Sequence, residues 1–134
     1  SNVGSIPRGR FLQICRTVRN DEALSPEGAN VNLVQIAGRN SLHYRTYERG
    51  VEDETLACGT GAVAVAVITS HLGNTRPPVS CYTRGGDLLT IDFVLDPSGA
   101  SDCHLTGPAV TTFTGDFTSL RFSSMEGESF TSKR

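Results

Sequence analysis

The pattern of apolar and polar residues divides the chain into short alternating stretches around one continuous apolar run. Residues 61–72 are almost all small or β-branched, so a helix built from them would have no polar side. The length of the run, its interleaved alanines, the Gly-Thr-Gly that opens it and Gly73 after it favour a helix over a strand. We therefore predict a helix at about residues 60–72 that is buried on all sides.

The stretches around this helix predict strands and turns. Two hairpins are indicated, one turning at residues 38–40 and one at residues 84–87, where glycines can take the positive φ of a tight turn. The predicted strands cover residues 11–18, 29–36, 42–47, 79–83, 88–95, 102–106, 110–113 and 120–122. A wholly apolar helix among hairpins must be wrapped by a sheet. The predicted fold class is α+β, a curved, mostly antiparallel sheet wrapped around one buried central helix.

The length of 134 residues suits a single domain with a real core. We predict a domain over residues 1–122 and a frayed, Ser-rich polar tail over residues 123–134. The net charge of −2 favours neither nucleic acid nor a membrane as a partner. No apolar run is long enough to cross a bilayer, and we expect a cytoplasmic protein. Because the chain opens on Ser-Asn without methionine, we expect it to be part of a longer product.

Four cysteines are scattered along the chain, at Cys15, Cys58, Cys81 and Cys103. A structural zinc site normally has closely spaced ligands, so the spacing predicts no metal site, and no cofactor is expected. We interpret the four cysteines as reduced thiols rather than as two disulfides. Three of the cysteines, all but Cys58, lie in strand-like stretches and are predicted to be inert.

Cys58 is different because it precedes the apolar helix. A helix start offers N–H groups without internal partners and a partial positive charge, so it favours bound anions. Taken alone, a cysteine beside a helix is more often a packed core residue. The following Gly-Thr-Gly and the charged pair Glu48 and Arg49 ten residues earlier favour a functional role. The sequence thus predicts a reactive thiol beside a site for a carboxylate, whereas acidic residues 52–54 are predicted to form a solvated loop.

Three motifs together resemble diaminopimelate epimerase. Residues 47–50 (Tyr-Glu-Arg-Gly) and 54–62 (Glu-Thr-Leu-Ala-Cys-Gly-Thr-Gly-Ala) resemble the second-cysteine signature of that family. Residues 28–32 and the stretches at 105–109 and 113–115 also resemble it, in the same order, so that the likeness spans about residues 9–117. The resemblance implies a cofactor-independent enzyme that interconverts LL- and meso-diaminopimelate, toward lysine and peptidoglycan. It also implies two similar halves, each a sheet around a central helix, with the site between them.

The resemblance assigns roles to individual residues. Cys58 would be the catalytic cysteine of the second half, and Glu48 a carboxylate needed for catalysis that also contacts substrate with Arg49. Gly59 and Thr60 would offer backbone N–H groups to the substrate carboxylate, and Asn30 would bind substrate. One departure concerns residues 51–55, which are one residue longer than the family pattern and lack its second glycine.

The resemblance covers the second half only. The family's first cysteine and its histidine have no counterpart here, since His43, His71 and His104 lie outside the histidine motif. Epimerisation removes a proton from one face of a carbon and returns it on the other, so it needs two acid/base groups. We therefore predict that this chain alone is inactive, that its partner is the missing N-terminal half, and that its uncovered surface could also form a homodimer.

Several other functions remain open. A proline racemase or hydroxyproline epimerase would use the same fold and paired cysteines. A cysteine hydrolase would use Cys58 as nucleophile with a histidine base nearby. A third alternative is a half-domain that binds ligand or its partner half without turnover.

Overall fold

The structure is a computed structural model that describes residues 2–116. The predicted strand at 120–122 and the predicted tail at 123–134 therefore lie outside the described residues. Two α-helices, two short 3-10 helices and six strands follow one another along the chain: η1 (Val3–Ser5), α1 (Arg8–Arg19), η2 (Glu22–Leu24), β1 (Val31–Gly38), β2 (Ser41–Glu48), β3 (Asp53–Thr55), α2 (Gly59–His71), β4 (Val79–Tyr82), β5 (Leu88–Asp96) and β6 (Gly99–Thr106).

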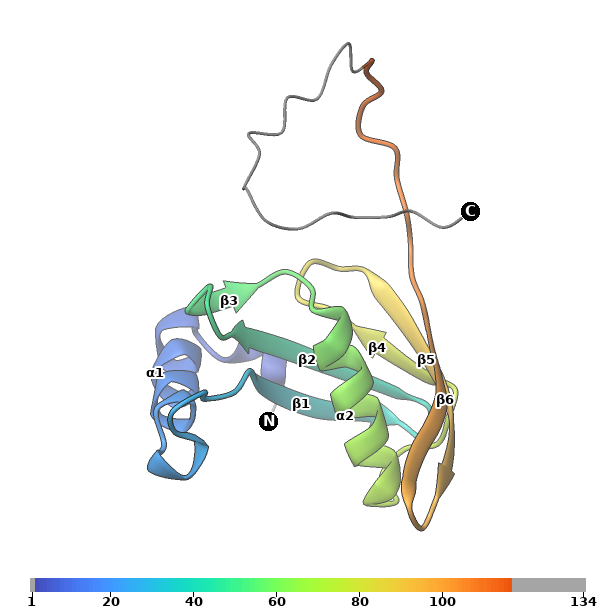
Figure 1. Ribbon diagram of the computed structural model, residues 1–134, viewed down its shortest axis with the longest axis horizontal. Coiled ribbons are helices and arrows are strands. Elements are labelled where there is room, and N and C mark those ends of the chain that lie inside the picture. The colour runs from blue at the N-terminus through green and yellow to red at the C-terminus, as the bar shows by residue number, and fades with distance from the viewer. Residues whose placement is uncertain (1, 117–134) are drawn as a thin grey trace, which may run out of the picture.

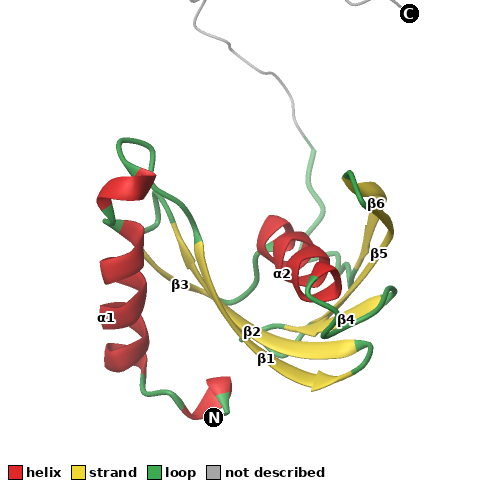
Figure 2. Ribbon diagram, turned by 90° about the horizontal axis from the view of Figure 1, so that it is seen from below, coloured by secondary structure: helices red, strands yellow, loops and turns green. Residues whose placement is uncertain are grey.

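All six strands form one sheet in the order β1-β2-β4-β5-β6, with the short β3 also paired to β2. Every pairing is antiparallel except that of β2 with β4. The two predicted hairpins are confirmed as β1–β2 and β4–β5. Figure 2 shows that the sheet curves around α2. The predicted α+β class and the curved, mostly antiparallel sheet are therefore confirmed.

Helix α2 occupies the predicted place, but it is buried on one side only. Its inner residues pack against β2, β4 and β5 in the main core, whereas Ile68 and Leu72 are 57% and 66% exposed. The prediction of burial on all sides is wrong in this respect, because the sheet covers the helix from one direction (Figure 2). Among the described residues, no helix combines the length and the apolar character needed to span a membrane.

The predicted strand at residues 11–18 is wrong, because these residues belong to helix α1. Phe11, Leu12 and Cys15 are buried, and their spacing places them on one side of a helix. Val18, in the last turn of the helix, is 43% exposed. Together with Val31 and other residues of β1 and β2, the buried side of α1 forms a second, smaller core. This core lies on the face of the sheet opposite α2 (Figure 2).

The predicted strand at residues 110–113 is also wrong. After β6, residues 107–116 contain neither helix nor strand and extend away from the sheet (Figure 1). Val110 and Phe113 are 82% and 84% exposed. The segment contains residues that favour strands, but no strand among the described residues pairs with it.

Candidate active site

Cys58 occupies the N-cap position of α2, with an extended backbone at φ −141° and ψ 111°. Its sulfur accepts a hydrogen bond from the backbone N–H of Gly61 at 3.3 Å and lies 3.4 Å from the hydroxyl oxygen of Thr60. A thiol thus takes the capping role that a hydroxyl or carboxylate usually performs. The residue is only 7% exposed. Cys58 is therefore held on the first turn of the helix, beside the exposed Gly59 and Thr60, whose N–H groups have no intrahelical partners.

The side chain of Tyr44 on β2 holds the backbone of Cys58 by hydrogen bonds. Its hydroxyl donates to the carbonyl oxygen of Cys58 at 2.9 Å and accepts from the N–H of the same residue at 3.4 Å. Burial raises the pKa of Tyr44 to about 12; hydrogen bonding to the Cys58 backbone partly offsets this, and charges on Cys58 and Glu48 raise it further. The hydroxyl therefore keeps its proton at neutral pH and remains available as a donor.

Glu48 is the last residue of β2, and its carboxylate is held by β3. The hydroxyl of Thr55 donates to Glu48 Oε1 at 2.5 Å. Thr55 comes three residues before Cys58 in the chain, so β3 connects the carboxylate to the segment that leads to the thiol. This contact fixes the orientation of Glu48 on the side of the sheet where Tyr44 and Thr46 also point.

Arg49 and Asn30 lie at the same end of the sheet as Glu48. The side-chain oxygen of Asn30 accepts a hydrogen bond from the backbone N–H of Arg49 at 2.8 Å. The Arg49 guanidinium donates to the carbonyl oxygen of Glu27 at 3.0 Å. Asn30 and Arg49 are both exposed. The structure thus brings Asn30, Glu48 and Arg49 together in one group and Cys58, Gly59 and Thr60 in another. Thr55 contacts the first group and Tyr44 contacts the second.

Sequence reasoning missed four residues that hold these groups: Asn32, Tyr44, Thr46 and Thr55. Asn32 Oδ1 accepts a hydrogen bond from the Thr46 hydroxyl at 2.7 Å, and the two residues are paired across β1 and β2. The two-residue period of a strand could have identified Tyr44 and Thr46. Together with Glu48 they occupy every second position of β2, so their side chains lie on one face of the sheet. Asn32 likewise follows Asn30 by two positions.

The longer segment at residues 51–55 begins in a turn at residues 49–52 and continues as strand β3. Gly50 and Glu52 adopt positive φ values of 89° and 56°. The Glu52 carboxylate accepts hydrogen bonds from the Gly50 N–H at 3.1 Å, the Tyr47 hydroxyl at 3.0 Å and Arg19 at 3.0 Å. These hydrogen bonds lower the pKa of Glu52 below its usual range, and the bond from the Gly50 N–H has the largest effect. Glu52 thus ties this turn to both β2 and α1.

Glu54 is not part of a solvated loop, so that prediction is wrong. Its carboxylate forms two hydrogen bonds with Arg45, at 2.6 and 2.9 Å, and the two side chains are 7% and 2% exposed. Arg45 also donates to the carbonyl oxygens of Val3 and Ile6 and lies over the ring of Phe11, 4.2 Å from its centroid. This buried pair joins the N-terminal segment to the strands that carry the candidate site.

The remaining cysteines lie away from the candidate site. Cys15 in α1 and Cys81 in β4 are fully buried, and burial raises the pKa of their thiols to about 11 and about 12. Both thiols therefore stay protonated at neutral pH, as expected for inert core residues. Cys103 is exposed on β6. Two of these three cysteines lie in strands as predicted, whereas Cys15 lies in a helix.

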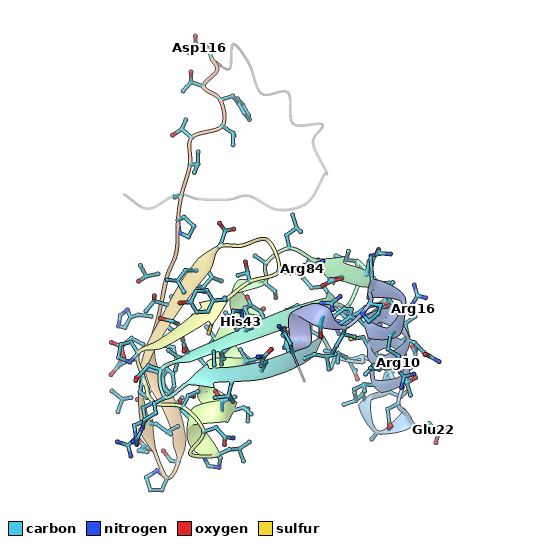
Figure 3. All side chains as sticks on the ribbon, turned by 180° about the vertical axis from the view of Figure 1, so that it is seen from behind. Arg10, Arg16, Glu22, His43, Arg84 and Asp116 are labelled. Atoms are coloured by element: carbon cyan, nitrogen blue, oxygen red, sulfur yellow. The ribbon has the colours of Figure 1, made fainter. Side chains whose placement is uncertain are left out.

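Within the described residues, no hydrogen bond or aromatic contact joins any of the three histidines to Cys58. His43 stacks on Tyr82, with ring centroids 4.9 Å apart, and points to the face of the sheet opposite α2 (Figure 3). His71 is the last residue of α2, about 18 Å along the helix from its start. His104 is exposed on β6. Within residues 2–116, no histidine therefore makes the hydrogen bond to the Cys58 thiol that the base of a cysteine hydrolase would make. Within residues 2–116, no group of three or more His, Cys, Asp or Glu side chains is arranged to hold a metal ion.

The fold and the capping thiol place the chain among α+β proteins with a curved sheet around a central helix and a cysteine at the start of that helix. A solved structure described as the Bacillus anthracis phenazine biosynthesis protein of the PhzF family has a similar fold. It aligns with a TM-score of 0.50 and 16% sequence identity, over 73% of this chain and 30% of that one. At this identity, the likeness concerns the fold alone.

The sequence comparisons identify the family. The family model described as diaminopimelate epimerase matches residues 9–110, and the chain belongs to this family. Proteins named diaminopimelate epimerase from Aquifex aeolicus and Methanocella arvoryzae are 41% and 45% identical to it, over 84% and 79% of this chain. A third, from Archaeoglobus fulgidus, is 45% identical over 78% of the chain. The chain spans only 35–40% of the length of these relatives.

Proposed function

We propose that the chain forms the second-cysteine half of a diaminopimelate epimerase, in which Cys58 is one of two acid/base groups. The observation that carries the proposal is the thiol of Cys58 at the N-cap of α2, in a chain of this family. A proton acceptor is thereby combined with the free N–H groups of Gly59 and Thr60. Donors aimed at a substrate carboxylate stabilise the charge that develops there when a carbon-bound proton is removed.

Glu48, Arg49 and Asn30 complete this half of the site in our proposal. Glu48 orients the substrate or a neighbouring group, and its hydrogen bond from Thr55 supports this role by fixing the carboxylate. The hydrogen bonds of Asn30 and Arg49 to backbone groups keep both residues at the end of β2. Binding of substrate by Asn30 would use its amide N–H groups, because its oxygen already accepts from Arg49.

The reaction requires a second acid/base group on the opposite side of the substrate, and we propose that a first-cysteine half of the family provides it. Three apolar residues are exposed: Ile68 and Leu72 of α2, and Phe113 after β6. Their exposure supports the proposal that a further polypeptide covers them. A second copy of this chain is the alternative occupant, which a measurement of molecular mass in solution tests. The pathways implied by the family, toward lysine and peptidoglycan, favour a cytoplasmic location.

The test combines this chain with a first-half chain of the family and diaminopimelate in deuterium oxide. We expect no exchange at Cα with the chain alone and measurable exchange with both halves. Cys58→Ala should abolish interconversion of the LL and meso isomers, whereas Cys103→Ala should retain it, because Cys103 is an exposed thiol on β6. Interconversion by the chain alone, or interconversion that survives Cys58→Ala, would contradict the proposal.

A further inference from the structure

The hydroxyl of Tyr44 makes two contacts, and both are with the backbone of Cys58. It donates to the carbonyl oxygen at 2.9 Å and accepts from the N–H at 3.4 Å. The carbonyl oxygen also receives the N–H of Ala62 at 2.9 Å, which is the first hydrogen bond of α2. Tyr44 is 2% exposed, so water does not compete for these contacts.

This arrangement supplies partners that the helix itself cannot supply. The N–H of an N-cap residue precedes the helix and has no intrahelical acceptor. Burial without a partner would cost free energy, and the Tyr44 hydroxyl provides that partner. Because one oxygen atom holds both the N–H and the carbonyl of Cys58, it restricts the rotation of the peptide groups on either side. The extended backbone that results places the sulfur where it accepts from Gly61.

We propose that Tyr44 is a positioning residue, whose hydroxyl holds the Cys58 backbone so that the thiol stays on the first turn of α2. Tyr44 acts through Cys58 and does not touch the reacting atoms. The consequence for catalysis rests on the proposed function: in an assembled enzyme, Tyr44→Phe should lower kcat while KM changes little, because the variant misplaces the thiol but leaves the substrate-binding groups intact.

The matched control is Tyr47→Phe. Tyr47 lies on the same strand and is 1% exposed, and its variant loses the hydrogen bond from its hydroxyl to Glu52 at 3.0 Å. Its side chain points to the other face of the sheet and does not contact Cys58. Both variants remove one hydroxyl oxygen from a buried ring, so a general loss of stability affects both, whereas a local effect at Cys58 is expected only in Tyr44→Phe.

The direct test follows amide hydrogen exchange and thiol alkylation in the full chain. In Tyr44→Phe, exchange at the N–H groups of Cys58 and Gly61 should accelerate by roughly tenfold, the equivalent of one lost hydrogen bond. Alkylation of Cys58 by iodoacetamide, located by mass spectrometry, should accelerate by a similar factor because the thiol leaves its cap. In Tyr47→Phe, both rates should stay within about twofold of the parent once the change in global stability is subtracted.

Equal behaviour of the two variants at Cys58 would overturn the proposal, whatever the activity of the assembled enzyme. If Tyr44→Phe does not fold, the parent chain decides the question by NMR. The hydroxyl proton of Tyr44 should exchange slowly and lie close to the Cys58 N–H, in contrast to that of Tyr82, which is 39% exposed. Exchange as fast as that of Tyr82 would contradict the proposal. Failure of the epimerase assay alone bears on the proposed function and leaves these measurements unaffected.

Discussion

The side-chain oxygen of Asn32 lies 2.9 Å from the position that a Cβ atom on Gly61 would take. The same Cβ would lie 3.2 Å from the sulfur of Cys58. Neither neighbour moves away freely, because the Asn32 oxygen accepts from Thr46 at 2.7 Å and the sulfur accepts from the Gly61 N–H. Strand β1 and the first turn of α2 therefore approach so closely that a residue without a side chain is needed between them.

Gly61→Ala should consequently destabilise the protein, although alanine is the better helix former. Intrinsic propensity favours alanine by about 1 kcal/mol, but steric overlap in a packed site costs about 1–3 kcal/mol. We expect a net decrease in the free energy of unfolding, measured by urea denaturation. The matched control is Gly9→Ala in α1, where a Cβ would meet nothing within 4 Å and should stabilise by up to about 1 kcal/mol. Equal stabilisation by both substitutions would contradict the packing argument.

Glu54→Gln should be strongly destabilising, because it leaves the Arg45 guanidinium buried without its counter-charge. Breaking a buried ion pair by removing one partner costs about 3–5 kcal/mol. Asp53→Asn is the control on the neighbouring residue. It removes the ion pair between Asp53 and Arg8, whose side chains are 41% and 61% exposed, respectively. The free energy of unfolding should fall by less than about 1 kcal/mol. Urea denaturation of both variants measures the difference, and comparable losses would show that the Arg45 site admits water.

Thr55→Val tests the hydrogen bond that orients Glu48. The substitution keeps the shape of the side chain and removes only the donor to the carboxylate. A hydrogen bond to a charged group contributes about 1.5 kcal/mol or more, so epimerase activity of the assembled halves should fall by roughly tenfold. Thr17→Val is the control, because the Thr17 hydroxyl bonds to a carbonyl oxygen within its own helix, α1. Unchanged deuterium exchange at Cα in Thr55→Val would argue against a role for this contact.

Stability should decline at alkaline pH in part because of the two buried thiols. The pKa of Cys81 is raised from 9.0 to about 12 and that of Cys15 to about 11. In the unfolded chain each thiol ionises near pH 9, whereas in the folded chain it stays protonated. The unfolded state therefore binds fewer protons above pH 9, and the free energy of unfolding falls, by about 1 kcal/mol per pH unit for each thiol. The loss attributed to Cys15 should level off near pH 11 and that of Cys81 near pH 12.

Thermal or urea denaturation between pH 7 and 11 measures this decline. Cys81→Ala should be less stable at pH 7, because it leaves a cavity, yet its stability should fall less steeply above pH 9. Cys103→Ser should follow the parent profile, because the Cys103 thiol is exposed. Identical slopes in the parent and Cys81→Ala would contradict the assignment of this effect to Cys81.

The sequence by itself determined the central helix, the two hairpins, the family and the place of Cys58 at the helix start. These features depend on short-range properties: a long run of small apolar residues between glycines, turns rich in glycine, and a contiguous motif. The Gly-Thr-Gly after Cys58 also predicted free N–H groups at the helix start, because this follows from helix geometry and not from distant contacts.

Only the tertiary structure decided the state of residues 11–18, the burial of Glu54 and the contact of Tyr44 with Cys58, because these features depend on residues distant in sequence. Residues 11–18 are a helix since Phe11 and Cys15 pack against β1 and β2, a contact that their own alternation did not indicate. Glu54 is buried because Arg45 lies opposite, and acidic residues without such a partner remain in water. The hydroxyl of Tyr44 meets Cys58 because β2 runs beneath the start of α2, a spatial relationship that no local pattern specifies.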